Sequence, residues 1–260
     1  MPDIPGVPWR WGERYLVTDF VMAKNVAIVE QADSLYMGNK DHFVEAVARW
    51  IREEFFYPLD DAGKPSASGK LFRHQKGLFR GYFFKKCVPY MWSLPVETLV
   101  SGCGICIDTA NLAGSVYRAK ALGGAWVCLG DVRSTEDNTL LGMHAWICVP
   151  YHGATWLLET TVHGLGANNL VLASDVYDRS SRWAQNAGLY YVQHARYNES
   201  EFIGDGPLGI GVVEAMGLPA KRVLLFGLDA THKQKPRKLY KEWQQEEMIK
   251  EHLLEEAYRG

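Results

Sequence analysis

The sequence lacks long apolar runs and a strong excess of charge of one sign. No stretch approaches the roughly 18 to 20 apolar residues that cross a bilayer, and the first residues, Met-Pro-Asp-Ile-Pro, lack the basic and apolar segments of a signal peptide. The net charge of -2 is too small to attract nucleic acid or an anionic membrane. We therefore predict a cytoplasmic protein with neither kind of partner.

The cysteines do not form an even set. Because there are five in 260 residues, a disulfide framework is disfavoured and we expect reduced thiols. Cys103 and Cys106 have the spacing of a zinc-ligand or redox pair, but no second pair at close spacing follows. A metal trio of His144, His152 and His163 is a weaker alternative, since two of these residues fall in predicted loops. We expect no metal and no cofactor.

The content of 47% hydrophobic residues is sufficient for one large domain with extensions. The predicted parts are an N-terminal extension over residues 1–40, a catalytic domain over 41–200, and a C-terminal extension over 201–260. A core helix is predicted over residues 41–55, from the spacing of its apolar side chains, with Asn39 or Asp41 as its N-cap. Other expected elements are a loop over 58–70, a short strand over 222–228 and a charged helix over 238–258.

Cys106 is predicted to begin a helix. Gly102 and Gly104 interrupt the chain before it, and the helical pattern continues to Ala121 before two glycines end it. A thiol has a pKa of about 8.5, and the positive end of a helix dipole favours its thiolate form. The backbone N–H groups there are also suited to an oxyanion hole. A buried cysteine at a tight turn is the alternative, and Asp108 is interpreted as a cap of the same helix.

Three strands are predicted after this helix, over residues 125–130, 144–149 and 155–160, with a polar loop over 133–139. The last two strands form a hairpin in which Pro150 pairs with Thr155, so that paired residue numbers sum to 305. In this register Glu159 lies on the same face as His144 and within its reach. A three-residue loop would instead send Glu159 to the opposite face.

These residues resemble the transglutaminase-like superfamily of papain-like cysteine enzymes. The matching segments occur in the family's order and are residues 104–110 (GICIDTA), Arg118, residues 144–146 (HAW) and residues 156–160 (WLLET). The resemblance covers roughly residues 41–165. It implies an α+β fold, with a papain-like core in which the nucleophile begins a helix that packs on an antiparallel sheet.

The resemblance also implies the roles of three residues. Cys106 would be the nucleophile, His144 the general base and acid, and Glu159 the carboxylate that orients the imidazole. The family usually has aspartate where this chain has Glu159, whose longer side chain must be ordered by one more rotamer. Cys103 is the rival nucleophile, but it lacks the aspartate two residues later and the alanine four residues later that follow Cys106.

The predicted function is cleavage or transfer of an amide acyl group through a cysteine thioester, on a protein or peptide substrate. Hydrolysis is favoured over amine transfer because water is always available. Two alternatives stay open, namely an inactive binding module of the same fold and an acyltransferase that uses coenzyme A. Arg118 is interpreted as an ion-pair partner, and the aromatic residues Trp146, Trp156 and Tyr191 as core or cleft-wall residues.

Overall fold

The computed structural model describes residues 5–8, 14–55, 71–76, 81–86, 92–102, 104–161 and 169–217. Several predicted features lie outside these residues. They are the loop over 58–70, Cys103, His163, the strand over 222–228 and the helix over 238–258.

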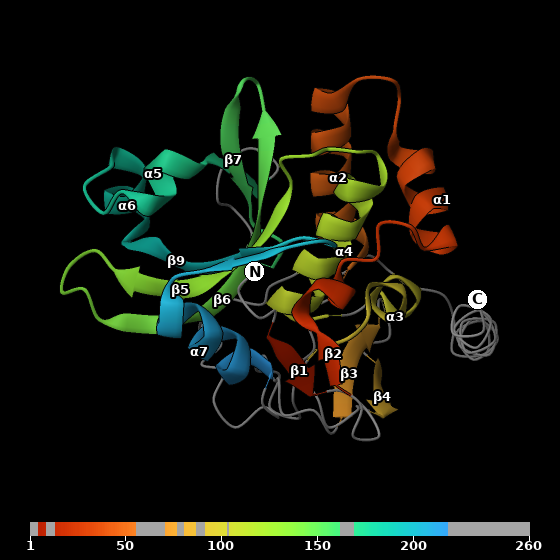
Figure 1. The fold of residues 1–260 in the computed structure, drawn as a ribbon, viewed down its shortest axis with the longest axis horizontal. Helices are drawn as coiled ribbons and strands as arrows, with labels where there is room; N and C mark the ends of the chain where they lie inside the picture. The colour runs from red at the N-terminus through yellow and green to blue at the C-terminus, as the bar shows by residue number, and fades with distance from the viewer. Residues whose placement is uncertain are drawn as a thin grey trace.

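Groups of helices and groups of strands follow one another along the described chain (Figure 1). The helices are η2 (Val17–Phe20), α1 (Val26–Leu35), α2 (Lys40–Glu54), α3 (Pro95–Ser101), α4 (Cys106–Ala119), α5 (Ala173–Tyr177), α6 (Arg182–Ala187) and α7 (Gly206–Gly217). The strands are β1 (Gly6–Pro8), β2 (Arg14–Leu16), β3 (Leu71–Lys76), β4 (Gly81–Lys86), β5 (Trp126–Ser134), β6 (Leu140–Tyr151), β7 (Ala154–Leu158), β8 (Leu170–Leu172), β9 (Leu189–Tyr197) and β10 (Phe202–Gly204).

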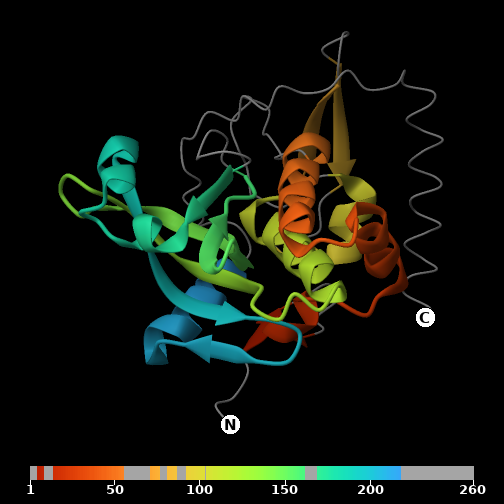
Figure 2. The ribbon, with the colours of Figure 1, turned by 90° about the horizontal axis from the view of Figure 1, so that it is seen from above.

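The main sheet has the order β10-β9-β5-β6-β7-β8 within the described chain, and every neighbouring pair is antiparallel. Helix α4 lies between this sheet and the pair α1 and α2, which gather on the far side of α4 (Figures 1 and 2). The predicted α+β fold, with a cysteine at the start of a helix on an antiparallel sheet, is confirmed. None of the helices described has the length and apolarity that a membrane span requires.

Helix α2 begins where its capping signal predicts. The side-chain oxygen of Asn39 accepts hydrogen bonds from the backbone N–H groups of Asp41 and His42, so Asn39 rather than Asp41 is the N-cap. The apolar face of the helix is buried, including Phe43 and Ile51. The prediction of a core helix over 41–55 is thus confirmed to within one residue at each end.

The hairpin of β6 and β7 has the predicted register. Pro150 pairs with Thr155 and Tyr151 with Ala154. The two connecting residues have positive φ, at 48° for His152 and 74° for Gly153, as a type I′ turn requires. The even loop keeps the predicted pairing and therefore the predicted face of Glu159.

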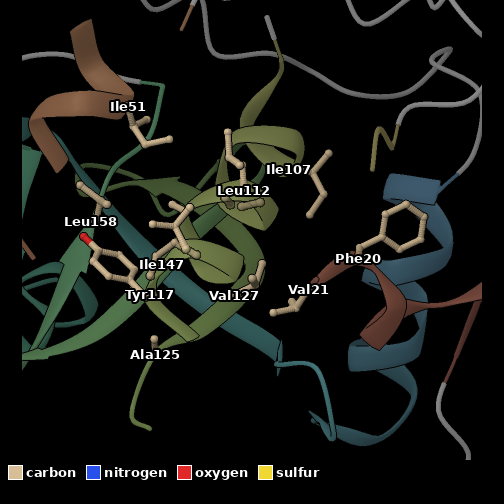
Figure 3. Close-up of a cluster of buried hydrophobic side chains, with 14 of the residues drawn as sticks. Phe20, Val21, Ile51, Ile107, Leu112, Tyr117, Ala125, Val127, Ile147 and Leu158 are labelled. Atoms are coloured by element: carbon tan, nitrogen blue, oxygen red, sulfur yellow. The ribbon is translucent and has the colours of Figure 1, made fainter. Parts of the chain in front are cut away.

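The sheet separates two buried clusters of apolar side chains. Alternate residues of β6 point to opposite faces, so Ala145 and Ile147 join the main core while Trp146 and Cys148 join a second cluster. Figure 3 shows part of the main core, in which side chains of η2, the helices and the sheet meet, among them Phe20, Ile51, Ile107, Leu112, Tyr117, Val127 and Ile147. Helices α5 and α6 contribute to the second cluster, on the other face.

A β-bulge interrupts the pairing of β5 with β9. Leu129 pairs with Ala195 but Gly130 pairs with Gln193, so one residue of β9 has no partner on β5. A Cβ atom on Gly130 would lie 1.9 Å from the carbonyl oxygen of Val192, so only glycine permits this close approach.

The bulge reverses which face the odd-numbered residues of β9 occupy. Ala195 and Tyr197 belong to the main core, whereas Leu189 and Tyr191 belong to the second cluster. The sequence predicted neither β9 nor the bulge. The predicted loop over 133–139 also begins too early, because β5 continues to Ser134 through its pairing with β9.

Candidate active site

Cys106 is the first residue of α4, as predicted. The preceding helix, α3, ends at Gly102, whose φ of 61° is in the left-handed region. Buried Asp108 fixes the turn between the helices, because its carboxylate accepts hydrogen bonds from the backbone N–H groups of Ser93 at 2.7 Å and Ile105 at 3.0 Å. Its predicted capping role is confirmed. A Cβ atom on Gly104 would lie 2.7 Å from the Cβ of Asp108, so glycine is needed beside this cap.

His144 and Glu159 form a buried pair. The Nε2 atom of His144 lies 2.7 Å from Oε2 of Glu159, which confirms the predicted shared face. The two residues are 4% and 1% exposed, respectively. An imidazole and a carboxylate held this close in a dry environment interact far more strongly than a surface pair.

The structure also places Cys106 beside this imidazole. Its side chain is close enough to contribute to the raised pKa of His144. Cys106 itself is 1% exposed. The structure therefore brings together the three residues predicted from the sequence, contributed by α4, β6 and the chain just after β7.

A second contact fixes α4 relative to Glu159. The hydroxyl of Thr109, one turn into the helix, donates a 2.9 Å hydrogen bond to the hydroxyl of Thr160. Both side chains are buried. Because Thr160 directly follows Glu159, this contact joins the helix that begins at Cys106 to the chain that carries the Glu159 carboxylate.

The Glu159 carboxylate has contacts on both oxygens. Oε1 accepts hydrogen bonds from the backbone N–H of Thr161 at 2.9 Å and from its hydroxyl at 3.1 Å. Oε2 accepts a 2.8 Å hydrogen bond from the hydroxyl of Tyr191, in addition to its contact with His144. The sequence pattern predicts Tyr191 only as a core or cleft-wall aromatic.

These surroundings favour the charged forms of both partners. Burial lowers the pKa of His144, but the charges of Glu159 and Cys106 and their hydrogen bonds outweigh burial and raise this pKa to about 10. Burial likewise raises the pKa of Glu159, but the charge of His144 and the hydrogen bonds from His144, Thr161 and Tyr191 bring this pKa below its ordinary value. Both shifts favour the imidazolium form of His144 and the carboxylate form of Glu159.

Aromatic rings enclose this pair on the second face of the sheet. Tyr191 meets the His144 ring edge-on, with centroids 5.7 Å apart, and Trp146 lies 6.3 Å from the same ring. Trp146 is fully buried, in agreement with its interpretation as a core aromatic, and its Nε1 donates to the hydroxyl of Tyr177. Trp156 is half-buried and packs against Tyr151 at a distance from the imidazole.

Arg118 is an ion-pair partner, as interpreted. Its guanidinium donates two hydrogen bonds to the carboxylate of Glu199, the one from Nε measuring 2.7 Å. Glu199 lies just after β9, so the pair links the end of α4 to the sheet. Arg118 lies at the opposite end of α4 from Cys106, so its role is structural.

The remaining polar candidates do not join this site. His152 lies in the hairpin turn, where its ring pairs with Asp41 at 3.0 Å. In the part of the chain that the structure describes, no three His, Cys, Asp or Glu residues are placed to hold a metal ion. Within the same residues Cys106, Cys128 and Cys148 are free thiols.

Comparisons with known proteins give a likeness of fold. No protein-family model matches the chain, and no curated protein matches it in sequence. Among solved structures, LapG of Legionella pneumophila is similar, with 18% identity, coverage of 73% of this chain and 86% of that chain, and a TM-score of 0.41. A candidate cysteine protease from Cytophaga hutchinsonii is also similar, with 12% identity, coverage of 71% and 48%, respectively, and a TM-score of 0.36.

Proposed function

We propose that this chain is a transglutaminase-like cysteine enzyme that cleaves amide bonds of protein or peptide substrates. Cys106 acts as nucleophile, His144 as general base and acid, and Glu159 as the carboxylate that orients the imidazole. The observation that carries the proposal is the position of Cys106 at the start of α4 beside His144, whose Nε2 lies 2.7 Å from Oε2 of Glu159. The imidazolium of His144 stabilises a thiolate at Cys106, and the carboxylate of Glu159 stabilises the imidazolium.

The reaction begins from a thiolate and imidazolium pair, in which the proton of Cys106 resides on His144. The sulfur attacks the amide carbonyl carbon, and the carbonyl π electrons move to the oxygen. Backbone N–H groups at the start of α4 lack intrahelical partners and are suited to stabilise this oxyanion. The start of α4 thus favours negative charge first on sulfur and then on oxygen.

Collapse of the tetrahedral intermediate breaks the carbon–nitrogen bond. His144 gives its proton to the departing amine and a thioester remains on Cys106. Formation of the carbon–sulfur bond has already removed the thiolate charge that helped hold the proton on His144, so the imidazolium is a stronger acid at the step that needs one. A water molecule, deprotonated by His144, then attacks the thioester and releases the acid and the Cys106 thiol.

Hydrolysis is preferred to transfer onto an amine in this proposal. The same thioester reacts with a lysine or another amine if that acceptor reaches it before water does. Proteolysis and protein crosslinking therefore share every step up to the thioester and differ only in the acceptor.

Digestion of a proteome-derived peptide library, with and without cadaverine, tests this proposal. We expect new peptide termini, read by mass spectrometry, from the wild-type chain and none from Cys106→Ala. Cadaverine attached to glutamine would instead identify amine transfer. Cys128→Ala removes another fully buried thiol and serves as the matched control, with turnover retained. Equal turnover by wild type and Cys106→Ala would overturn the proposal.

A further inference from the structure

We propose that Tyr191 is a positioning residue of this site, which holds Glu159 in place as a carboxylate so that Glu159 can serve His144. This inference rests on the proposed function, since it assigns a residue to the same reaction. In this role Tyr191 does not act directly on the Cys106 thiol or on the substrate carbonyl. It acts through Glu159.

The hydrogen-bond geometry supports this role. The Tyr191 hydroxyl and His144 Nε2 lie 2.8 Å and 2.7 Å from the same oxygen, Oε2 of Glu159. The Thr161 backbone N–H and hydroxyl contact the other oxygen. Tyr191 is 2% exposed and Glu159 is 1% exposed, so water does not replace a lost contact easily.

The length of the glutamate side chain explains why such a residue is needed. Glutamate has one more rotatable bond than aspartate, and each ordered bond costs conformational entropy. A hydroxyl on Oε2 and two donors on Oε1 restrict this rotation from both sides. The Tyr191 ring also packs edge-on against His144, so it contacts both members of the pair.

The fold places Tyr191 at this position through the bulge opposite Gly130. Without the change of register between Leu129 and Gly130, Tyr191 would share the face of Ala195 and Tyr197 in the main core. With the bulge, its side chain lies on the face of Trp146, where His144 and Glu159 also lie. The bulge opposite Gly130 thus brings the Tyr191 hydroxyl to the Glu159 carboxylate.

The test is the rate of Cys106 alkylation by iodoacetamide against pH, for wild type and Tyr191→Phe. The titratable groups that act on Glu159 within the described chain are His144 on β6, Tyr191 on β9 and, through His144, Cys106. Loss of a donor to Oε2 makes the carboxylate easier to protonate, and a protonated Glu159 no longer stabilises the imidazolium. We expect the acid limb of the profile to move to higher pH, with labelling at pH 5 reduced about tenfold and little change on the plateau.

Two further variants separate positioning from structure. Tyr117→Phe removes another buried hydroxyl, which donates to the Val44 carbonyl in the main core, and it should leave the acid limb unmoved. If Tyr191→Phe does not fold, 3-fluorotyrosine at position 191 keeps the ring and strengthens the donor, so the acid limb should move to lower pH.

The outcomes distinguish this inference from the function on which it rests. An unreactive Cys106 in the wild type would overturn the proposed function itself. A reactive wild type, with the same acid limb in Tyr191→Phe and in the fluorotyrosine protein, would overturn the role of Tyr191 alone.

Discussion

Glu159 has the most completely ordered side chain of the candidate site. Its two oxygens face His144, Tyr191 and both donors of Thr161. Glu159 and His144 form a buried pair, so the low polarity of the surroundings strengthens the attraction between their charges. Removal of one partner leaves the charge of the other buried and uncompensated. Glu159 is thus held by contacts that suit the length of its side chain.

Replacement of Glu159 by glutamine should destabilise the chain in a pH-dependent way. Removal of one partner of a buried pair costs on the order of 3–5 kcal/mol. His144 contributes stability that is complete below its unfolded-state pKa of about 6.5 and is lost as the pH rises through its folded pKa of about 10. Glu159, whose pKa is lowered, contributes above its unfolded-state value of about 4.3 and loses this contribution in more acidic solution.

The difference in unfolding free energy between wild type and Glu159→Gln should therefore be largest near pH 5 to 6 and shrink toward pH 10. Urea unfolding at several pH values measures it, with Glu136→Gln on the exposed loop after β5 as the control. A difference that stays constant across this range would contradict the charged pair.

Sequence motifs were sufficient to predict that Cys106, His144 and Glu159 lie close together. The motifs work because each lies within one element whose local pattern is strong. Tyr191 could not be assigned in this way, because its contact with Glu159 depends on a bulge that a period-two pattern does not reveal.

Among the elements, the start of α4 depends on Asp108. Its carboxylate satisfies the backbone N–H groups of Ser93 and Ile105, which are otherwise without a side-chain acceptor at this turn. This contact determines the direction in which the helix begins, and with it the position of the Cys106 sulfur.

Asp108→Ala should lower the unfolding free energy by roughly 1–3 kcal/mol for each buried donor left unpaired. Asp108→Asn retains one acceptor and should lose about half as much. Chemical denaturation of the three proteins measures the series. Equal stability of wild type and Asp108→Ala would show that the turn is held by other contacts.

The bulge between β5 and β9 depends on Gly130. Gly130→Ala should cost about 3 kcal/mol or more, because the new Cβ atom meets backbone rather than a movable side chain. Gly123→Ala is the matched control, since a Cβ atom there has nothing within 4 Å. Thermal unfolding compares the two variants, and equal melting temperatures would contradict the close approach of Gly130 to Val192.

Local rules predicted the elements whose determinants are near in sequence. Asn39 and the apolar spacing after it predicted α2, and the even loop at His152 and Gly153 predicted the hairpin register. Strand β9 was not predicted, because its side chains are divided between two cores and its alternation breaks at the bulge. The early end predicted for β5 has the same cause, since pairing with β9 extends that strand.

The whole molecule is organised around the line where the two buried clusters meet. Cys106 and Ile107 belong to the main core with α4, whereas Tyr191 and Trp146 belong to the second cluster. His144 lies between them and contacts both sides. The candidate site is therefore assembled only when both faces of the sheet are covered, which couples the site to the complete fold.

In the proposed mechanism, His144 activates the Cys106 thiol. The most direct test maps iodoacetamide labelling of each cysteine against pH by peptide mass spectrometry, for wild type and His144→Ala. Cys128, whose pKa is raised by burial, serves as an internal reference in each sample. We predict selective labelling of Cys106 well below pH 8 that is lost in His144→Ala. Slow labelling of every cysteine, unchanged by the substitution, would contradict it and favour an inactive binding module.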